Sequence, residues 1–253
     1  MFDGLMEFLN THDIDLQNCR GPSYDNASAM SGRWNGLQSK VVAENKLAEW
    51  IPCIKHSLNL VGKTSAECCA AAVAFFYLLE KLHVFFTAST RRYQVLTKTL
   101  KSAGSSVFVP KRVSPTRWSS RVDLSKALEQ GYSSFKEALM KIEKDKYEKD
   151  VIRCKAKGLY DQMCQLEMGI YTVFWHEVLN RVNATSHILQ DPKADLHTAV
   201  AALTSSQKLI EDKQDLFSEY EAEGAENSGT TTYKQTLTLN RPPRVRMNPL
   251  DYG

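Results

Sequence analysis

The sequence lacks an apolar run long enough to cross a membrane and a cysteine pattern typical of a disulfide framework. Its longest apolar run, Cys68 to Leu79, has twelve residues, whereas a membrane-spanning helix needs about 20. Six cysteines in 253 residues are too few for a disulfide-stabilised scaffold. The first residues also lack the basic and apolar regions of a secretory leader. We therefore expect an intracellular chain, nuclear or cytoplasmic, with free thiols and no membrane partner.

Several motifs that carry common enzyme chemistry are also missing. The sequence has no glycine-rich phosphate loop of the Rossmann or Walker type and no Gly-x-Ser-x-Gly nucleophile turn. Cys53 and His56 form a Cys-x-x-His unit, but no second ligand pair stands at a spacing suited to zinc, and a structural zinc site needs four ligands. We therefore expect neither a structural zinc within this chain nor a small-molecule cofactor.

What the sequence does contain is an uneven distribution of charge. The net charge of +3 is small, but nine basic residues and one acid, Asp123, lie between Thr87 and Lys126. Between Glu211 and Glu226 the balance reverses, with seven acids and one lysine. A local excess of positive charge neutralises phosphates and favours nucleic-acid binding. We call residues 87–126 the basic strip.

Hydrophobic periodicity predicts a short α/β region followed by helices. Strand-like runs at Leu16–Arg20 and Ala48–Ile51 flank a helix through Trp34 and Leu37 towards Glu44. Further helices are predicted at Phe2–Asn10, at Ile54–Val61 with a stop at Gly62, at Thr64–Thr87 as a buried helix, at Arg91–Lys101, at Trp118–Glu143, at Asp150–Gln190 with a break at Gly158, and at Leu196–Glu221. Residues after Gly224 are polar and Pro-rich, which predicts a disordered tail.

Three motifs stand in a specific order along this pattern. Asp25 lies in the turn segment Asp-Asn-Ala-Ser-Ala-Met-Ser-Gly, Cys53 opens Cys-Ile-Lys-His-Ser-Leu-Asn-Leu, and Arg117 opens Arg-Trp-Ser. In order and spacing these motifs resemble hAT-superfamily transposases, most closely the domesticated or decayed relatives found in MYM-type zinc-finger-like proteins. The resemblance covers roughly residues 1–209. It implies an α/β fold: a partial ribonuclease-H-like core at 1–90, a mostly α-helical insertion region at 91–222, and a tail at 223–253.

The resemblance also implies a catalytic centre, of which this sequence carries only a part. Family members hold Mg²⁺ or Mn²⁺ with three carboxylates, and only the second has a counterpart here, Asp25. The resemblance places His56 beside that centre, with Cys53 supporting it. Because two-metal DNA cleavage needs several carboxylates, we expect a catalytically incomplete protein. The alternatives are an Asx-turn for Asp25 and, for His56, a side chain packed at a strand–helix junction.

The resemblance further implies contacts with DNA. A tryptophan at the place of Trp118 stacks on an extruded base in the transposases, with Arg117 on a phosphate; the alternative is that Trp118 anchors the first turn of a helix. The predicted nucleic-acid contacts are Arg91, Arg92, Lys111, Arg112, Arg117 and Trp118. The expected function is residual DNA binding by a transposase-derived protein. A second hypothesis is a helical module that packs on other transposase-like chains, and a third is a product without a stable fold.

The two predicted strands give the sharpest geometric expectation. If Leu16–Arg20 and Ala48–Ile51 pair in parallel through a right-handed crossover, their carboxyl ends lie at one edge of the sheet. Asp25 and His56 should then lie within about one side chain of each other, since adjacent strands are about 4.8 Å apart.

Overall fold

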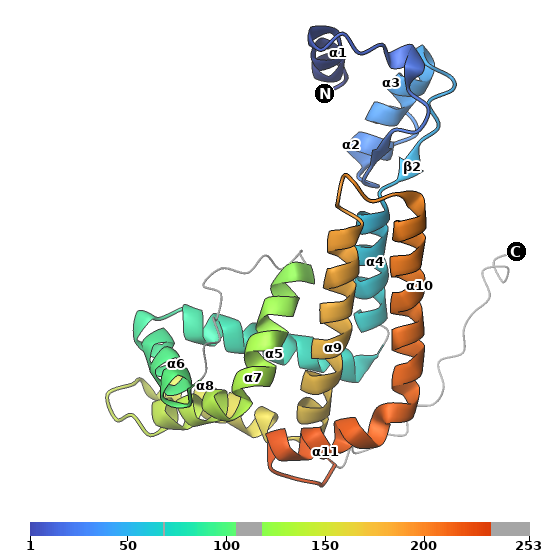
Figure 1. Ribbon diagram of the computed structural model, residues 1–253. Helices are drawn as coiled ribbons and strands as arrows, with labels where there is room; N and C mark the ends of the chain where they lie inside the picture. Colours follow the sequence, from blue (N-terminus) through green and yellow to red (C-terminus); the bar gives the residue numbers. More distant parts are fainter. Residues whose placement is uncertain (68, 105–117, 234–253) are drawn as a thin grey trace, which may run out of the picture.

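The computed structural model describes residues 1–67, 69–104 and 118–233. It is mostly helical, with one small two-stranded parallel sheet. Figure 1 shows a small N-terminal unit standing on one end of a column formed by α4 (Ile54–Glu67), α9 (Leu166–Ile188) and α10 (Leu196–Asp212). Beside this column lie α5 to α8, and α11 crosses its other end.

The N-terminal unit has a small core of its own. It contains α1 (Phe2–Thr11), the 3-10 helix η1 (Leu16–Asn18), β1 (Ser23–Tyr24), α2 (Ser28–Ser31), α3 (Leu37–Glu44) and β2 (Ile51–Pro52). Leu16, Leu37, Val41 and Ala48 are buried together, and one face of α1 packs on them. Asn45 ties these segments together, since its side-chain amide donates to the carbonyls of Leu16 and Cys19, each at 2.8 Å.

The parallel pairing of the two strands is confirmed, but the strands lie further along the chain than predicted. Ser23 pairs with Ile51 and Tyr24 with Pro52. The prediction of a strand at Leu16–Arg20 is wrong: Leu16–Asn18 forms η1, and the strand begins only at Ser23. The reason is local: the Asp15 carboxylate accepts the Gln17 amide N–H at 2.9 Å, which favours a turn.

Two predicted helix boundaries in this half are also wrong. The helix expected through Trp34 is split into α2 and α3. Its backbone turns tightly between Gly32 and Gly36, where a Cβ on Gly36 would lie 2.4 Å from the Gly32 nitrogen. The predicted stop at Gly62 lies inside α4, which continues to Glu67.

The helical character of the second half is confirmed, but the final helix predicted at Leu196–Glu221 is wrong as one element, since it is divided into α10, η2 and α11. The remaining elements are α5 (Ala70–Thr87), α6 (Thr90–Ser102), α7 (Trp118–Glu143), α8 (Asp150–Met163), the 3-10 helix η2 (Lys213–Leu216) and α11 (Phe217–Ser228). The break expected at Gly158 falls instead at Cys164 and Gln165, between α8 and α9. The expected boundary between helical region and tail, 222/223, falls inside α11.

The main core forms around α5, as its apolar sequence predicts. Phe75, Leu78, Leu82 and Phe86 of this helix are almost completely buried against α7, α8 and α9. The rings of Phe86 and Phe135 meet edge to face at 5.7 Å, a favourable aromatic geometry. Among the described residues, α5 is the one helix long and apolar enough to cross a membrane by composition, and half of it is buried inside the protein.

A very close helix crossing joins α11 to α9. A Cβ on Gly169 would lie 2.2 Å from the Gly224 carbonyl oxygen, and one on Gly224 would lie 2.6 Å from the Ile170 nitrogen. Only glycine permits this approach of two backbones. The crossing positions Tyr220 of α11 in a separate apolar cluster with Leu166, Ile170 and Val173.

Candidate functional site

The sheet places two of the predicted site residues next to each other. Asp25 directly follows β1 and Cys53 directly follows β2, so the parallel register that pairs Tyr24 with Pro52 continues into these residues. The Cys53 amide donates to the Tyr24 carbonyl at 3.1 Å, one residue before Asp25. His56 lies in the first turn of α4, which begins at Ile54. The carboxyl ends of the two strands therefore gather Asp25, Cys53 and the start of α4.

Polar contacts hold this end of the sheet in place. The Tyr24 hydroxyl donates to the Gln38 side chain, and the Trp50 indole N–H donates to the Tyr24 carbonyl at 3.4 Å. The rings of Tyr24 and Trp50 are stacked with their centroids 6.3 Å apart. Burial raises the pKa of Tyr24, with Cys19 adding to the effect. Tyr24 therefore remains a neutral hydrogen-bond donor that fixes β1 on α3.

The Asp25 carboxylate has a local structural role. Its Oδ1 accepts the Ala27 amide N–H at 3.1 Å, the Asx-turn that is the alternative expected for an aspartate in such a turn. Among the described residues, no three His, Cys, Asp or Glu side chains are grouped so that they could hold a metal ion. A two-metal centre needs carboxylates on both ions. The residues at this sheet edge therefore do not fit the Mg²⁺ or Mn²⁺ that the resemblance implies.

The structure removes Arg92 from the surface of the basic strip. Arg92 is only 8% exposed, and its guanidinium lies 4.7 Å from the centre of the Phe85 ring. It stands on the buried face of α6 together with Leu96, Thr99 and Leu100. The prediction of Arg92 as a surface contact for nucleic acid is therefore wrong: its place on the apolar face of the helix directs it inward.

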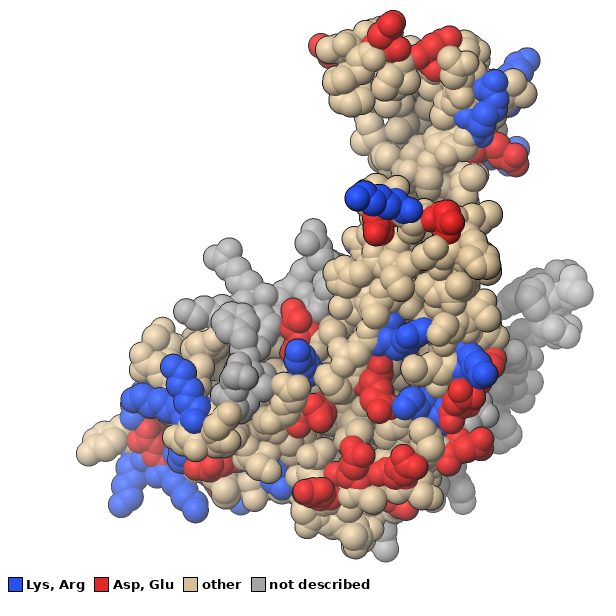
Figure 2. Space-filling model, in the orientation of Figure 1, with Lys and Arg blue, Asp and Glu red and all other residues tan. Residues whose placement is uncertain are grey.

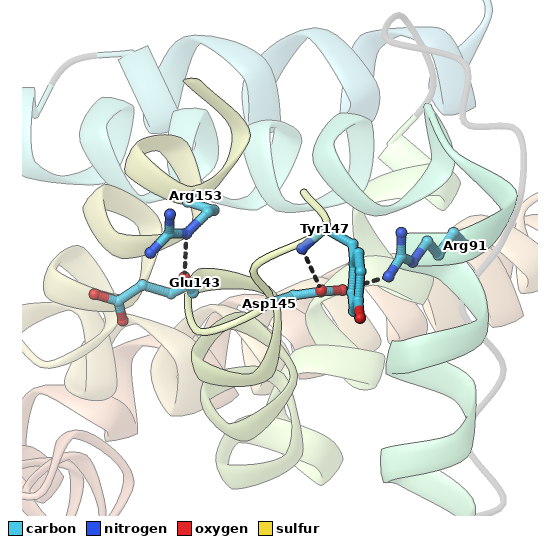
Figure 3. A network of polar contacts seen from close by, with 5 residues as sticks. All are labelled: Arg91, Glu143, Asp145, Tyr147 and Arg153. Carbon is cyan, nitrogen blue, oxygen red and sulfur yellow. Dashed lines mark hydrogen bonds and ion pairs between the residues drawn. The ribbon is translucent and has the colours of Figure 1, made fainter. Parts of the chain in front are cut away.

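Arg91 is exposed but engaged in an ion pair (Figure 3). Its Nη2 lies 2.6 Å from Oδ2 of Asp145, and the other oxygen of Asp145 accepts the Tyr147 amide N–H at 2.9 Å. Nearby, the Arg153 Nε donates to the Glu143 carbonyl at 2.8 Å. These contacts fix the loop between α7 and α8 against the first turn of α6. Arg91 therefore contributes to structure as well as to surface charge.

A third arginine of the strip, Arg121, packs on an aromatic ring. Its guanidinium lies 4.6 Å from the centre of the Phe76 ring. Burial lowers the pKa of Arg121, while Glu67 and Glu80 act in the opposite direction. A partly buried cation over a ring stabilises local packing, so this residue also serves the fold.

Of the exposed cations in the described part of the strip, Arg91, Lys98 and Lys101 lie on α6 and Lys126 lies on α7. Lys98 and Lys101 are exposed, and with Gln94 and Thr97 they line a shallow hollow of about 270 Å³. Figure 2 shows Lys and Arg side chains gathered at the end of the molecule where α6 and the α7–α8 loop lie, and Asp and Glu gathered over α11. Neither lysine is among the predicted contacts, although their spacing with residues 94 and 97 marks one helix face.

Of the remaining predicted contacts, the structure describes only the backbone position of Trp118. Lys111, Arg112 and Arg117 lie outside the described residues, and Trp118 is the first residue of α7. Comparisons of the chain with models of known protein families, with curated proteins and with solved structures found no match.

Proposed function

We propose that this chain is a hAT transposase-derived protein that binds DNA through the exposed face of α6 and does not cleave DNA by itself. The observation that carries the proposal is the sheet edge. Asp25 and Cys53 end two hydrogen-bonded parallel strands, and His56 stands one helical turn beyond. This is the order in which the family's motifs would be presented.

The edges of the sheet support its interpretation as part of a larger ribonuclease-H-like core. The amides of Glu49, Ile51 and Cys53 donate towards the first strand, so the alternate residue Pro52 faces the outer side of β2. Proline has no N–H and blocks the addition of a strand there. Further strands would therefore add along β1. This one-sided sheet is what two edge-proximal strands of such a core would give.

The uneven distribution of charge over the surface supports the proposal of DNA binding. Lys98 and Lys101 lie one turn apart on an exposed helix face, away from the acidic residues gathered over α11. Cations in such an array release counterions from the DNA backbone when they bind it. The binding would be independent of DNA sequence, because phosphate contacts carry no base information.

The test is fluorescence anisotropy with a labelled duplex over a series of salt concentrations. The double variant Lys98→Gln/Lys101→Gln should bind more weakly, and the slope of log affinity against log salt should become shallower by about 0.9 for each phosphate that is no longer neutralised. The matched control is Lys193→Gln/Lys208→Gln, which removes the same charge from exposed positions elsewhere. Equal binding by the two double variants would remove the DNA-binding proposal.

The absence of cleavage has its own test. We expect the purified chain to leave supercoiled plasmid intact in Mg²⁺ or Mn²⁺, because Asp25 is one carboxylate in an Asx-turn and metal-dependent cleavage requires ions held in position. Nicking that disappears in Asp25→Ala would show a complete centre.

A second candidate function is a helical module that packs on another transposase-like chain. Leu60 and Val61 of α4 and Val200 and Ile210 of α10 are exposed, and an apolar hollow of about 540 Å³ lies between α4, α9 and α10. The variant Val61→Asp/Val200→Asp should abolish self-association in analytical ultracentrifugation if this module is the function. Unchanged sedimentation of a monomer by wild type and variant would contradict it.

A further inference from the structure

A groove separate from the sheet edge lies between α5 and α8. Its volume is about 610 Å³, within the range of small-molecule sites. One wall comes from Tyr77, Val84 and Phe85 of α5, and the other from Ile152 and Leu159 of α8. The groove reaches the turn between α5 and α6, where Arg92 forms part of its lining.

Arg92 is an unusual residue to find at this depth. It is 8% exposed, and its Nε is buried without a hydrogen-bond partner among the described residues. Its one described contact partner is the ring of Phe85, at 4.7 Å. A buried charged donor left unsatisfied carries the full cost of its desolvation. Because this nitrogen has almost no accessible surface, an oxyanion in the groove would satisfy it after a shift of the Arg92 side chain towards the groove.

The charges around the groove indicate which anion fits. Lys81, Arg92 and Lys155 line it, against the single acid Glu80. The Lys81 ammonium lies over the Tyr77 ring at 4.1 Å, and Lys155 is exposed on α8. An excess of cations around one guanidinium suits a doubly charged phosphate better than a single carboxylate.

We propose that this groove binds an organic phosphate, with the phosphate on the buried Arg92 and an apolar group between α5 and α8. A guanidinium group offers paired N–H donors, which match two oxygens of a phosphate. The apolar walls then cover the organic part of the ligand. Such a site needs no contact with the basic face of α6, so it stands apart from DNA binding.

Gly158 of α8 gives a way to test the site without touching the arginine. It lines the groove, and a Cβ built on it meets no atom within 4 Å. Gly158→Trp should therefore fill the groove, whereas Gly158→Ala should leave it open. Arg92→Met keeps an apolar side chain of similar length on Phe85 and removes the charge.

The experiment is titration calorimetry with phenyl phosphate as the probe, beside benzyl alcohol and inorganic phosphate. We expect wild type and Gly158→Ala to bind phenyl phosphate, and Arg92→Met and Gly158→Trp to bind it at least about tenfold more weakly. Benzyl alcohol should not bind, and inorganic phosphate should bind more weakly than its phenyl ester. If Arg92→Met does not fold, Gly158→Trp and the exposed variant Lys155→Gln decide the question.

Several results would overturn the proposal. One is the absence of binding heat with phenyl phosphate at about 10 mM, a concentration at which even millimolar affinity is detected. Another is equal affinity of wild type and Gly158→Trp for phenyl phosphate. Equal affinity for inorganic phosphate would reduce the site to an anion site without an organic part. Displacement of phenyl phosphate by a short DNA duplex would make the groove part of the DNA-binding surface.

Discussion

The crossing of α9 and α11 predicts that two glycine-to-alanine substitutions will destabilise the protein although alanine is the better helix former. In an exposed helix interior, replacing glycine by alanine stabilises by about 1 kcal/mol. At Gly169 the new methyl group would lie 2.2 Å from the Gly224 carbonyl oxygen. Real Cβ atoms do not approach a backbone oxygen so closely, and a backbone atom, unlike a side-chain end, cannot rotate away.

The cost follows from what must move. To admit the methyl group, α11 must retreat from α9 by an ångström or so, which loosens Tyr220 and its cluster with Leu166, Ile170 and Val173. Overpacking of this kind typically costs about 1–3 kcal/mol. After the helix-propensity gain is deducted, we expect Gly169→Ala and Gly224→Ala each to lower the free energy of unfolding by up to about 2 kcal/mol.

Gly158→Ala is the matched control, because Gly158 also lies inside a helix and has open space at its Cβ. It should raise stability by up to about 1 kcal/mol. In thermal melts followed by circular dichroism, each kcal/mol corresponds to about 2–4 °C for a chain of this size. If Gly169→Ala melts with Gly158→Ala above wild type, the close crossing does not exist in solution.

Three further predictions test other contacts. Burial lowers the pKa of His176 below 6.5, so the unfolded chain takes up the proton first as pH falls. The free energy of unfolding should therefore decline below about pH 6.5, and His176→Gln should flatten that decline. Urea titrations at several pH values would contradict this if the free energy of unfolding fell equally with pH in wild type and variant. Arg91→Ala removes one exposed ion pair worth up to about 1 kcal/mol of stability. Asp145→Ala should destabilise the protein more, because Asp145 also accepts the Tyr147 amide N–H. Equal melting temperatures of the two variants would argue against this double role. Asn45→Ala should cost about 1–3 kcal/mol, because Asn45 is 2% exposed and its amide donates two hydrogen bonds of 2.8 Å, each worth about 0.5–1.5 kcal/mol. An unchanged urea midpoint would refute it.

The helices could be predicted from the sequence because long apolar patterns determine them. Phe75, Leu78, Leu82 and Phe86 repeat at three and four residues and are buried as that period requires. The strands could be predicted only in order and direction. Each pairs over two residues, and in so short an element one local bond, from Gln17 to Asp15, outweighs apolar content.

The candidate site shows the same limit at the level of single residues. Counting charges placed Arg92 on the surface, whereas its spacing with Leu96 and Leu100 places it on the buried face of α6. That signal was present in the sequence, since the apolar residues recur every four positions. The groove beside Arg92 was not predictable, because α5 and α8, which form its walls, lie far apart along the chain.

The column of α4, α9 and α10 has a consequence for the order in which the protein assembles during synthesis. Helix α4 ends at Glu67 and α10 begins at Leu196, so about 130 residues separate α4 from one of its neighbours. At about 5–20 residues per second, the apolar side of α4 waits about 6–26 seconds on the ribosome before α10 emerges. During this interval Leu58, which later lines the hollow with α10, has only solvent or a chaperone to cover it. The newly made chain is therefore most prone to aggregate before its last helices are made, even though the finished protein buries its main core in helices translated earlier.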